Sequence, residues 1–461
     1  MTARRLAFPL VFCAAWLLCA FTPHSARNLG TDLLVTAAPA YDALAALRGG
    51  ERFPRGAQLL RVHNGATEPL VADFAATADA SISFDGASVL FAGKKAEQDP
   101  WQIWELTFAS GALRPLTHDS TDAIRPLYLP RGRFVYARRG PHGFTMISAR
   151  VHAPATLGEA DDLPDVFPIT YIQGSALPVD VLADGRILFE AGFPLGASAT
   201  PELYLVYADG SGVESYRCDH GAARWGGRQL ASGDVIFTHG TSLARFTSPL
   251  AHEVRITAPR ASYAGGIAEL SFGEWLVSAH TASAARFGLY TWRPGAASLA
   301  PVLAANGVNL VDPVLVAPRE RPRRHPSALH PWSYANLLAL DARLSRDGAL
   351  KGVPATVRVE GQDAAGHATE LGTAPIASDG SFFVRVPGDT PVRFAVLDAH
   401  GTVLRAEHGW FWARSGEQRI CVGCHTGPER AAENRVPAVL DRSTTPADCT
   451  GRVQPSAKGG R

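Results

Sequence analysis

The sequence is poor in methionine, in cysteine and in excess charge of either sign. Its 461 residues include 2 methionines and 6 cysteines, and 44 Lys and Arg against 43 Asp and Glu give a formal net charge of +1. Near neutrality excludes the long-range field that attracts nucleic acid. No stretch shows sustained helical periodicity, no Ser-His-Asp order or phosphate-binding glycine loop stands out, and a second Cys-x-x-Cys for a Cys-only zinc site is absent.

The N-terminus has the pattern of a secretory signal peptide. Arg4 and Arg5 precede an apolar stretch from Leu6 to Phe21, followed by small or polar residues. A transmembrane anchor is the alternative, but Pro9 interrupts the stretch, which falls short of the ~20 residues needed to span a bilayer. We expect residues 1–26 to be removed, which predicts an exported, periplasmic chain with no membrane span after cleavage.

A glycine turn followed by an apolar strand recurs along the first two thirds of the chain. The residues before the turn glycines are spaced by 46, 53, 48 and 40 residues, and they are Asp85, Arg131, Asp184, Ser232 and Phe272. Four-stranded propeller blades repeat every ~40–50 residues. With flanking strands at Gln58–Val62 and Val308–Ala317, this rhythm favours a six-bladed β-propeller over residues 50–318. Five or seven blades, or two β-sandwiches with similar turns, are the alternatives.

A second folded unit is predicted beyond the propeller. Residues 319–332 are rich in Pro and Arg and are typical of a linker. Short β-type runs separated by Gly, Pro and Asp turns then predict a small β-sandwich-like domain over residues 333–442. The polar segment 443–461 is expected to be a flexible tail. The predicted fold class is therefore all-β.

One motif carries a specific chemistry. Cys421, Cys424 and His425 form Cys-x-x-Cys-His, the attachment signature of a c-type haem, in which two thiols bind the haem and the imidazole lies beside the iron. A redox pair, a zinc half-site or a disulfide are the alternatives for a bare Cys-x-x-Cys. Export agrees with haem attachment, so we expect one covalent haem c.

The ligand on the opposite face of the iron is open. Apart from Met1 the only methionine is Met146, so a Met/His iron is improbable unless Met146 folds close to the haem. His408 is the nearest upstream histidine and is a candidate haem neighbour. The aromatic run Trp410–Trp412 after it is either a wall for the haem or part of the sandwich core. More distant histidine candidates are His220, His239, His280, His367 and His400.

A second cluster of candidate ligands follows a predicted blade hairpin. Cys218, Asp219 and His220 offer a thiol, a carboxylate and an imidazole, which suit a divalent metal such as zinc. The alternative for Cys218 is a disulfide to Cys449, because these two cysteines remain when the haem takes its pair.

The C-terminal third resembles a known family. Leu371-Gly-Thr-Ala-Pro, Asp379-Gly-Ser-Phe-Phe-Val and the run from Trp410 to His425 resemble the middle domain of the hydrazine synthase alpha subunit over roughly residues 337–440. The resemblance implies a haem c between propeller and middle domain. It also implies a zinc ion shared by His425 and Cys218. The family's tyrosine iron ligand lies four residues after the motif histidine, where this chain has Glu429. That departure indicates a relative and not a hydrazine synthase.

The predicted function is that of an exported monohaem c-type cytochrome with a redox role. One hypothesis is a haem oxidoreductase acting on a small, possibly nitrogenous molecule, with Glu429 a possible iron ligand by position. An electron-transfer subunit, or a propeller-based binding or sensor module with a non-catalytic haem, are the alternatives. A redox partner protein is expected, a small-molecule substrate is compatible with the first hypothesis, and no nucleic-acid partner is expected.

Overall fold

A computed structural model describes most of the chain and shows it to be almost entirely β-structure. The described residues are 26–153, 163–192, 200–216, 223–248, 252–271, 273–304, 307–323, 325–344, 350–363, 365–407, 409–422 and 435–451. Among them the only helices are η1 (Ala46–Arg48) and α1 (Ala438–Arg442). No helix in these ranges is long and apolar enough to cross a membrane.

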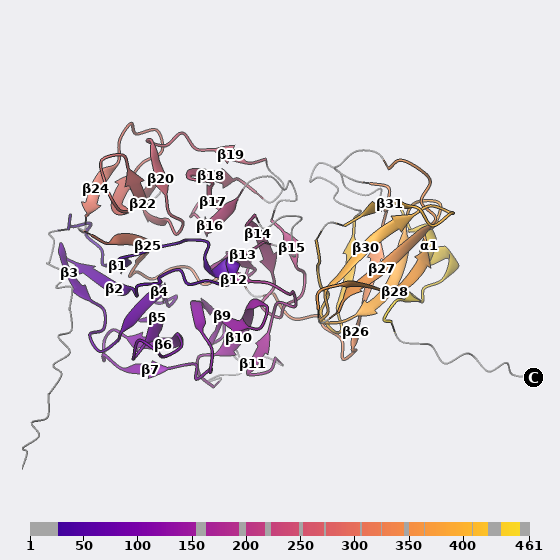
Figure 1. Cartoon of the computed structure of the whole chain (residues 1–461), viewed down its shortest axis with the longest axis horizontal. Coiled ribbons are helices and arrows are strands. Elements are labelled where there is room, and N and C mark those ends of the chain that lie inside the picture. The colour runs from indigo at the N-terminus through magenta and orange to yellow at the C-terminus, as the bar shows by residue number, and fades with distance from the viewer. Residues whose placement is uncertain are drawn as a thin grey trace, which may run out of the picture.

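The first 25 strands form six antiparallel sheets arranged as the blades of a propeller (Figure 1). This confirms the prediction of six blades. From the innermost strand outward, blade 1 is β25 (Asn309–Leu315), β1 (Leu33–Ala38), β2 (Gln58–His63) and β3 (Ala66–Pro69). Blade 2 is β4 (Ala76–Ile82), β5 (Ser88–Lys94), β6 (Gln102–Thr107) and β7 (Leu113–Pro115). Blade 3 is β8 (Ala123–Leu129), β9 (Arg133–Gly140), β10 (Gly143–Arg150) and β11 (Val166–Pro168).

The remaining three blades follow in chain order. Blade 4 is β12 (Ala176–Val181), β13 (Ile187–Ala191), β14 (Glu202–Val206) and β15 (Glu214–Ser215). Blade 5 is β16 (Arg224–Gln229), β17 (Val235–His239), β18 (Ser242–Phe246) and β19 (Val254–Arg255). Blade 6 is β20 (Ala261–Tyr263) with β21 (Ala268–Ser271), β22 (Glu274–Thr281), β23 (Gly288–Trp292) and β24 (Ala300–Leu303).

The two ends of the propeller meet in blade 1. Strand β25, from the end of the propeller sequence, pairs antiparallel with β1, with Thr36 opposite Val311 and Ala37 opposite Leu310. The sequence patterns do not predict β1, because it follows the signal segment without a glycine turn. Its six residues, apolar except for Thr36, are all buried, so it contributes a fully buried strand to the closure.

The recurring glycine turns connect the first two strands of a blade. Gly86, Gly185 and Gly233 have φ of 76°, 89° and 90°. Residues with a side chain rarely adopt this conformation, which explains why glycine recurs there.

Every innermost strand is interrupted at one level, which in blades 2 to 6 lies five or six residues before the turn position. Strands β4, β8, β12, β16 and β25 have a register shift there, and in blade 6 the interruption separates β20 from β21. Asp79, Arg125 and Asp312 occupy this level in neighbouring blades with φ of 60°, 51° and 53°. β-Bulges of this kind turn a side chain out of the regular alternation. They place charged groups at the propeller axis.

A long loop between β1 and β2 covers one end of that axis. Its Ala46 and Phe53 pack with Ala78, Leu177 and Trp225 of several inner strands. Its Arg52 is 6% exposed and forms ion pairs with Asp79 of blade 2 and, at 2.6 Å, with Asp312 of blade 1. One buried guanidinium therefore joins blade 1, which contains the closure, to blade 2.

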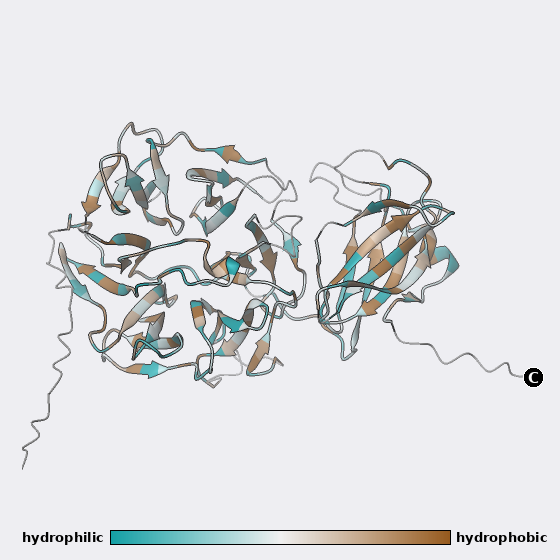
Figure 2. Cartoon of the chain, viewed as in Figure 1, coloured by the Kyte–Doolittle hydropathy of each residue, from teal (hydrophilic) through white to brown (hydrophobic). Residues whose placement is uncertain are grey.

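The C-terminal domain is a sandwich of two four-stranded sheets. One sheet has the order β32 (Gln418–Cys421), β26 (Tyr334–Ala339), β29 (Phe382–Pro387) and β33 (Ala447–Asp448). The other has the order β28 (Ala368–Pro375), β27 (Thr356–Gln362), β30 (Val392–Leu397) and β31 (Val403–Ala406). Alternating apolar and polar residues along these strands (Figure 2) place one face of each sheet in a shared core with Leu337, Val359, Val384 and Phe394.

The segment predicted to be a flexible tail is ordered in its first part. Strand β33 pairs in parallel with β29, and Cys449 is 0% exposed in the sandwich core. The sequence does not predict this strand because the segment is polar in composition. Only two residues of β33 pair with β29, and Cys449 is the one residue after it that packs in the core.

Candidate haem-attachment site

Cys421 ends an edge strand of the sandwich. Strand β32 runs parallel to β26, with Ala339 opposite Cys421, and the Leu340 N–H donates to the Cys421 carbonyl at 2.9 Å. Because side chains alternate along a strand, Cys421 lies on the same face as Arg419, while Ile420 points the other way and is 67% exposed. Cys421 itself is half-buried against the edge of the sandwich core.

The thiol of Cys421 is held in its neutral form. Burial raises its pKa, Glu407 and Glu417 act in the same direction, and Arg419 opposes them. A raised pKa is the opposite of what a catalytic or redox-active cysteine needs, because the thiolate is the reactive form. The environment of Cys421 therefore does not favour the redox-pair alternative.

Most of the other predicted site residues lie outside the described residues. These are Cys424, His425 and Glu429 after β32, Cys218, Asp219 and His220 after blade 4, and His408 between β31 and the aromatic run. The structure nevertheless describes the residues that flank two of these segments, up to residue 216 and from 223 in one case, and up to 422 and from 435 in the other.

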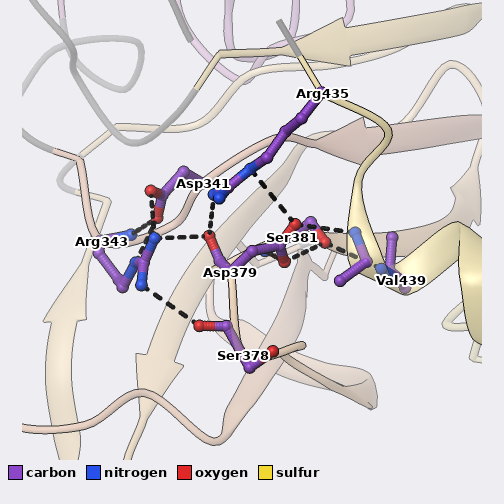
Figure 3. A network of polar contacts seen from close by, with 8 residues as sticks. Asp341, Arg343, Ser378, Asp379, Ser381, Arg435 and Val439 are labelled. Carbon is purple, nitrogen blue, oxygen red and sulfur yellow. Dashed lines mark hydrogen bonds and ion pairs between the residues drawn. The ribbon is translucent and has the colours of Figure 1, made fainter. Parts of the chain in front are cut away.

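The chain returns to the sandwich at Arg435, close to where β26 ends (Figure 3). The Asp379 side chain accepts a hydrogen bond from the Ala438 N–H at 2.8 Å, and the Ser381 hydroxyl accepts one from the Val439 N–H at 3.0 Å. Arg435 also reaches the Asp379 carbonyl at 3.4 Å. Although burial opposes it, the hydrogen bonds that the carboxylate accepts from the Ala438 N–H and from the hydroxyl and N–H of Ser381 keep the pKa of the Asp379 carboxyl below its usual value. This acceptor therefore remains charged at neutral pH.

A second arginine fixes the same corner. Arg343 forms a two-pronged contact with Asp341, at 2.8 Å and 2.7 Å, and donates to the Asp379 carbonyl at 2.8 Å (Figure 3). Since Asp341 follows β26, and β26 pairs with β32, both ends of the segment between Cys421 and Arg435 are attached to one region of the domain.

Residues 412–417, which precede β32, form hydrogen bonds with a turn of the propeller. Trp412 Nε1–H donates to the Gly210 carbonyl at 2.9 Å, and Arg414 donates to the Asp209 carbonyl. The Glu417 carboxylate accepts the Gly212 N–H at 3.1 Å. Four side chains of the C-terminal domain thus contact the turn between β14 and β15, the fourth being Arg419, which donates to the Val213 carbonyl.

This turn brings blade 4 against the strand that carries Cys421. In Figure 1 the C-terminal domain lies beside the propeller next to β14 and β15. The Trp412 ring is 0% exposed and packs among apolar residues of blades 3 and 4, including Met146, Tyr204 and Val213. Trp412 is therefore an interdomain anchor, whereas its neighbour Phe411 packs against the sandwich core as one of the two predictions for the aromatic run expected. The role of the run as a haem wall stays a prediction.

Two charged side chains near Cys421, Arg419 and Glu407, are not predicted from the sequence because neither belongs to a motif. Arg419 Nη1 is buried and has no hydrogen-bond partner among the described residues. Glu407, at the end of β31 on the other sheet, accepts the Phe394 N–H at 2.9 Å. Burial raises the pKa of its carboxyl to about 7, against the opposing effects of the Phe394 N–H, Arg419 and Arg393.

The remaining described candidates lie in structural roles. Met146 is 0% exposed and packs in the core shared with Trp412. Cys449 directly follows β33, which is the edge strand of the sheet opposite to β32. Its buried position does not favour a disulfide to Cys218. His239 is paired with Glu253 at 2.5 Å in blade 5, and His367 is exposed in a turn beside Asp363.

Comparisons with known proteins agree with this architecture. Residues 341–426 match the family model described as the hydrazine synthase alpha subunit middle domain. The structure of hydrazine synthase from Kuenenia stuttgartiensis is similar with a TM-score of 0.75 and 17% identity, covering 89% of this chain and 71% of that one. TolB from Acinetobacter baumannii matches with a TM-score of 0.45 and 12% identity, over 63% of this chain and 68% of that one.

The β-propeller domain of the Trilobed protease from Pyrococcus furiosus matches with a TM-score of 0.38 and 14% identity, over 62% of this chain and 96% of that one. No curated protein matches the sequence. Residues 341–426 are therefore a relative of the hydrazine synthase alpha subunit middle domain, and the chain as a whole is similar in fold to the hydrazine synthase structure.

Proposed function

We propose that this protein is an exported monohaem c-type cytochrome whose haem is attached through Cys421 and Cys424 at the edge of the sandwich that faces blade 4. The observation that carries the proposal is the position of Cys421. It lies two residues after Arg419, which contacts the propeller, on the same face of β32. A haem attached there would lie at the junction of the two domains.

The residues around Cys421 suit a haem. Attachment joins each cysteine sulfur to a carbon derived from a haem vinyl group, and a buried neutral thiol at a sheet edge is compatible with that addition. The unpartnered Nη1 of Arg419 is a donor for a haem propionate. Exposed apolar side chains border the segment at both ends, Ile420 at 67% and Val436 at 69%, and would be covered by the macrocycle or by the chain that carries it.

Zinc at the same junction is compatible with the chain connections. Cys218 is five residues beyond Val213 and His425 is six beyond Arg419, and Arg419 donates to the Val213 carbonyl. Because five or six residues span at most ~20 Å, both side chains can reach one point near this contact. Cys218 and His425, with Asp219 or His220, are the proposed zinc ligands.

The proposed redox role is oxidoreduction of a small molecule at the iron, with nitrogenous compounds as the candidate substrate class. A bound haem supplies one-electron chemistry, and the chain supplies its surroundings. Met146 packs in the core around Trp412, and Glu429 is the candidate iron ligand by its position four residues after His425. Glu407, whose pKa is near neutrality, is placed to accept or release a proton beside Cys421.

The experiment that tests this role is the optical spectrum of the ferrous protein with and without carbon monoxide. An enzyme with an open iron position should be high-spin and shift on adding carbon monoxide. A low-spin spectrum insensitive to carbon monoxide would instead support the alternative, an electron-transfer subunit with two strong ligands.

Zinc is tested separately by metal analysis. The proposal predicts one zinc per chain in the wild type and loss of that zinc in Cys218→Ser, with the haem absorbance retained. Unchanged zinc content in Cys218→Ser would remove Cys218 from the site. Cys449→Ser is the matched control, because Cys449 is a core residue and is not a proposed ligand.

A further inference from the structure

The propeller axis contains a cavity that the haem proposal does not use. Its volume is about 60 Å³, and residues from all six blades line it. Space of this size holds a few water molecules or a ligand of a few heavy atoms. None of the residues that contact the C-terminal domain line it, so it is separate from the site around Cys421.

Ion pairs satisfy nearly all the carboxylate oxygens in this cavity. Asp79 accepts hydrogen bonds from Arg52 and, at 3.1 Å, from the Arg125 N–H. Glu190, which is 0% exposed, accepts from Arg125 Nη1 at 2.9 Å and from the Gly226 N–H at 2.5 Å. Asp312 accepts from Arg52 at 2.6 Å. The acidic groups therefore have little capacity left to bind a cation.

Hydrogen-bond donors are left over instead. Arg52 Nε is buried and has no partner in the described part of the chain, and neither has the buried Oη of Tyr41. Within the part of the chain that the structure describes, Arg125 uses only Nη1 among its side-chain nitrogens. Its side chain is 11% exposed and lines the cavity, so the fork of Nε and Nη2 is free to bind a planar pair of oxygens.

The bulges explain how a charged side chain comes to lie on the axis. In an uninterrupted inner strand, residue 125 would follow the alternation of β8. Its φ of 51° and the register shift between Ile124 and Leu127 break that alternation. Non-glycine residues adopt this conformation at a cost of about 1 kcal/mol or more each, and such strain concentrates at functional sites.

We propose that the axial cavity binds a small carboxylate, through the free guanidinium fork of Arg125 with Arg52 Nε and Tyr41 Oη as additional donors. The three arginines that line the cavity, Arg52, Arg125 and Arg228, balance the three acids Asp79, Glu190 and Asp312. Since the lining is formally neutral, affinity should be modest, on the order of millimolar. The site lies entirely within the propeller and does not depend on the haem.

The test is a titration of the full-length protein with ¹³C-labelled acetate, followed by NMR line broadening. Sodium chloride at equal ionic strength and methylammonium chloride are the reference titrations. Saturable acetate binding at one site per chain is expected, with no saturable methylammonium binding. Absence of saturation at roughly 50 mM acetate, or preferential binding of methylammonium, would overturn the proposal.

Two variants separate the cavity from nonspecific binding. Arg125→Lys keeps the charge opposite Glu190 but loses the fork, and Ala80→Val reduces the cavity volume without removing a charge. Each should weaken acetate binding at least tenfold, and thermal unfolding should show that both remain folded. If both folded variants bind acetate as the wild type does, the cavity is not the binding site.

Discussion

At the scale of single residues, buried charge decides what the described structure can do. Arg52, Asp79 and Asp312 form a buried cluster in the propeller, whereas Arg419 and Glu407 lie near the predicted haem attachment. Buried ionic groups are tolerated only when their partners are in place. Substituting such a residue should therefore change the free energy of unfolding, as the predictions for Arg52 and Glu407 illustrate.

Removing Arg52 should strongly destabilise the propeller. Arg52→Met leaves Asp79 and Asp312 without their shared cation, which typically lowers the free energy of unfolding by about 3–5 kcal/mol. Arg48→Met is the matched control in the same loop, because the Arg48–Asp42 pair is exposed, with side-chain exposures of 60% and 51%. The control should change stability by less than about 1 kcal/mol. Equal losses in a urea denaturation series would contradict the account.

Glu407 should make stability fall as the pH rises. Its folded pKa of about 7 lies above the ordinary value of 4.5, so the folded state holds a proton that the unfolded state releases. The free energy of unfolding should therefore decrease between pH 4.5 and about pH 7, by at most about 3 kcal/mol, and this contribution should level off at higher pH. Glu407→Gln should remove this part of the slope.

The measurement for Glu407 is chemical denaturation of both proteins at pH 5 and pH 8. The difference between the wild type and Glu407→Gln should be larger at pH 8, where the carboxylate is ionised. Parallel pH dependences of the two proteins would show that Glu407 titrates normally.

At the scale of elements, the blade turns also serve as contact points for the linker. The backbone N–H groups of Arg319 and Arg323 donate to the carbonyls of Phe84 and Ala183, each at 2.9 Å, so the linker lies against turns of blades 2 and 4. At Gly185 a Cβ would collide with the Arg323 carbonyl, but at Gly233, the equivalent turn of blade 5, nothing lies within 4 Å of one.

These two glycines form a matched pair. Both have φ near 90°, so Gly233→Ala should cost about 1–2 kcal/mol from the backbone alone. Gly185→Ala should cost more, because it also displaces the linker, and trypsin should cleave faster after Arg319 and Arg323, neither of which precedes a proline. Limited proteolysis and thermal unfolding measure both effects. Indistinguishable variants would show that the linker does not lie against blade 4.

Much of the element pattern was predictable, and the failures have physical causes. The glycine turns locate blades 2 to 6 because a positive φ restricts the residue type at each turn. The short β-type runs of the predicted sandwich lie at residues 336–341, 356–360, 381–386 and 393–398, and they correspond to β26, β27, β29 and β30. Strands β1 and β33 were missed because neither follows such a turn and β33 has two residues. The axial bulges were missed because pairing with neighbouring strands, not local sequence, defines them.

The residues of the candidate site could be predicted from the sequence only where they belong to a motif of known chemistry. Cys421 was identified because Cys-x-x-Cys-His has a fixed spacing. Arg419 and Glu407 were not, since their importance depends on the approach of β31 and blade 4, which are distant in sequence. Trp412 was recognised as part of an aromatic run, but its packing partners lie in blades 3 and 4, so its role required the tertiary structure.

At the scale of the whole molecule, the contact between propeller and sandwich determines where a haem at Cys421 would lie. Trp412 contributes both packing and the hydrogen bond to the Gly210 carbonyl. Trp412→Phe should lose roughly 1 kcal/mol, the usual value of one hydrogen bond, whereas Trp412→Ala should lose about 3–5 kcal/mol. Calorimetry should show one transition for wild type and separate domain transitions for Trp412→Ala. A single unshifted transition would contradict the anchor role.

The most direct test of the central claim is the intact mass of the denatured protein after expression with the c-type haem maturation system. The wild type should carry the mass of one haem that remains attached in acid and denaturant, and Cys421→Ser with Cys424→Ser should have only the mass of the polypeptide. The Cys449→Ser control should retain the haem. A wild-type mass equal to that of the polypeptide alone would contradict the proposal that this chain is a c-type cytochrome.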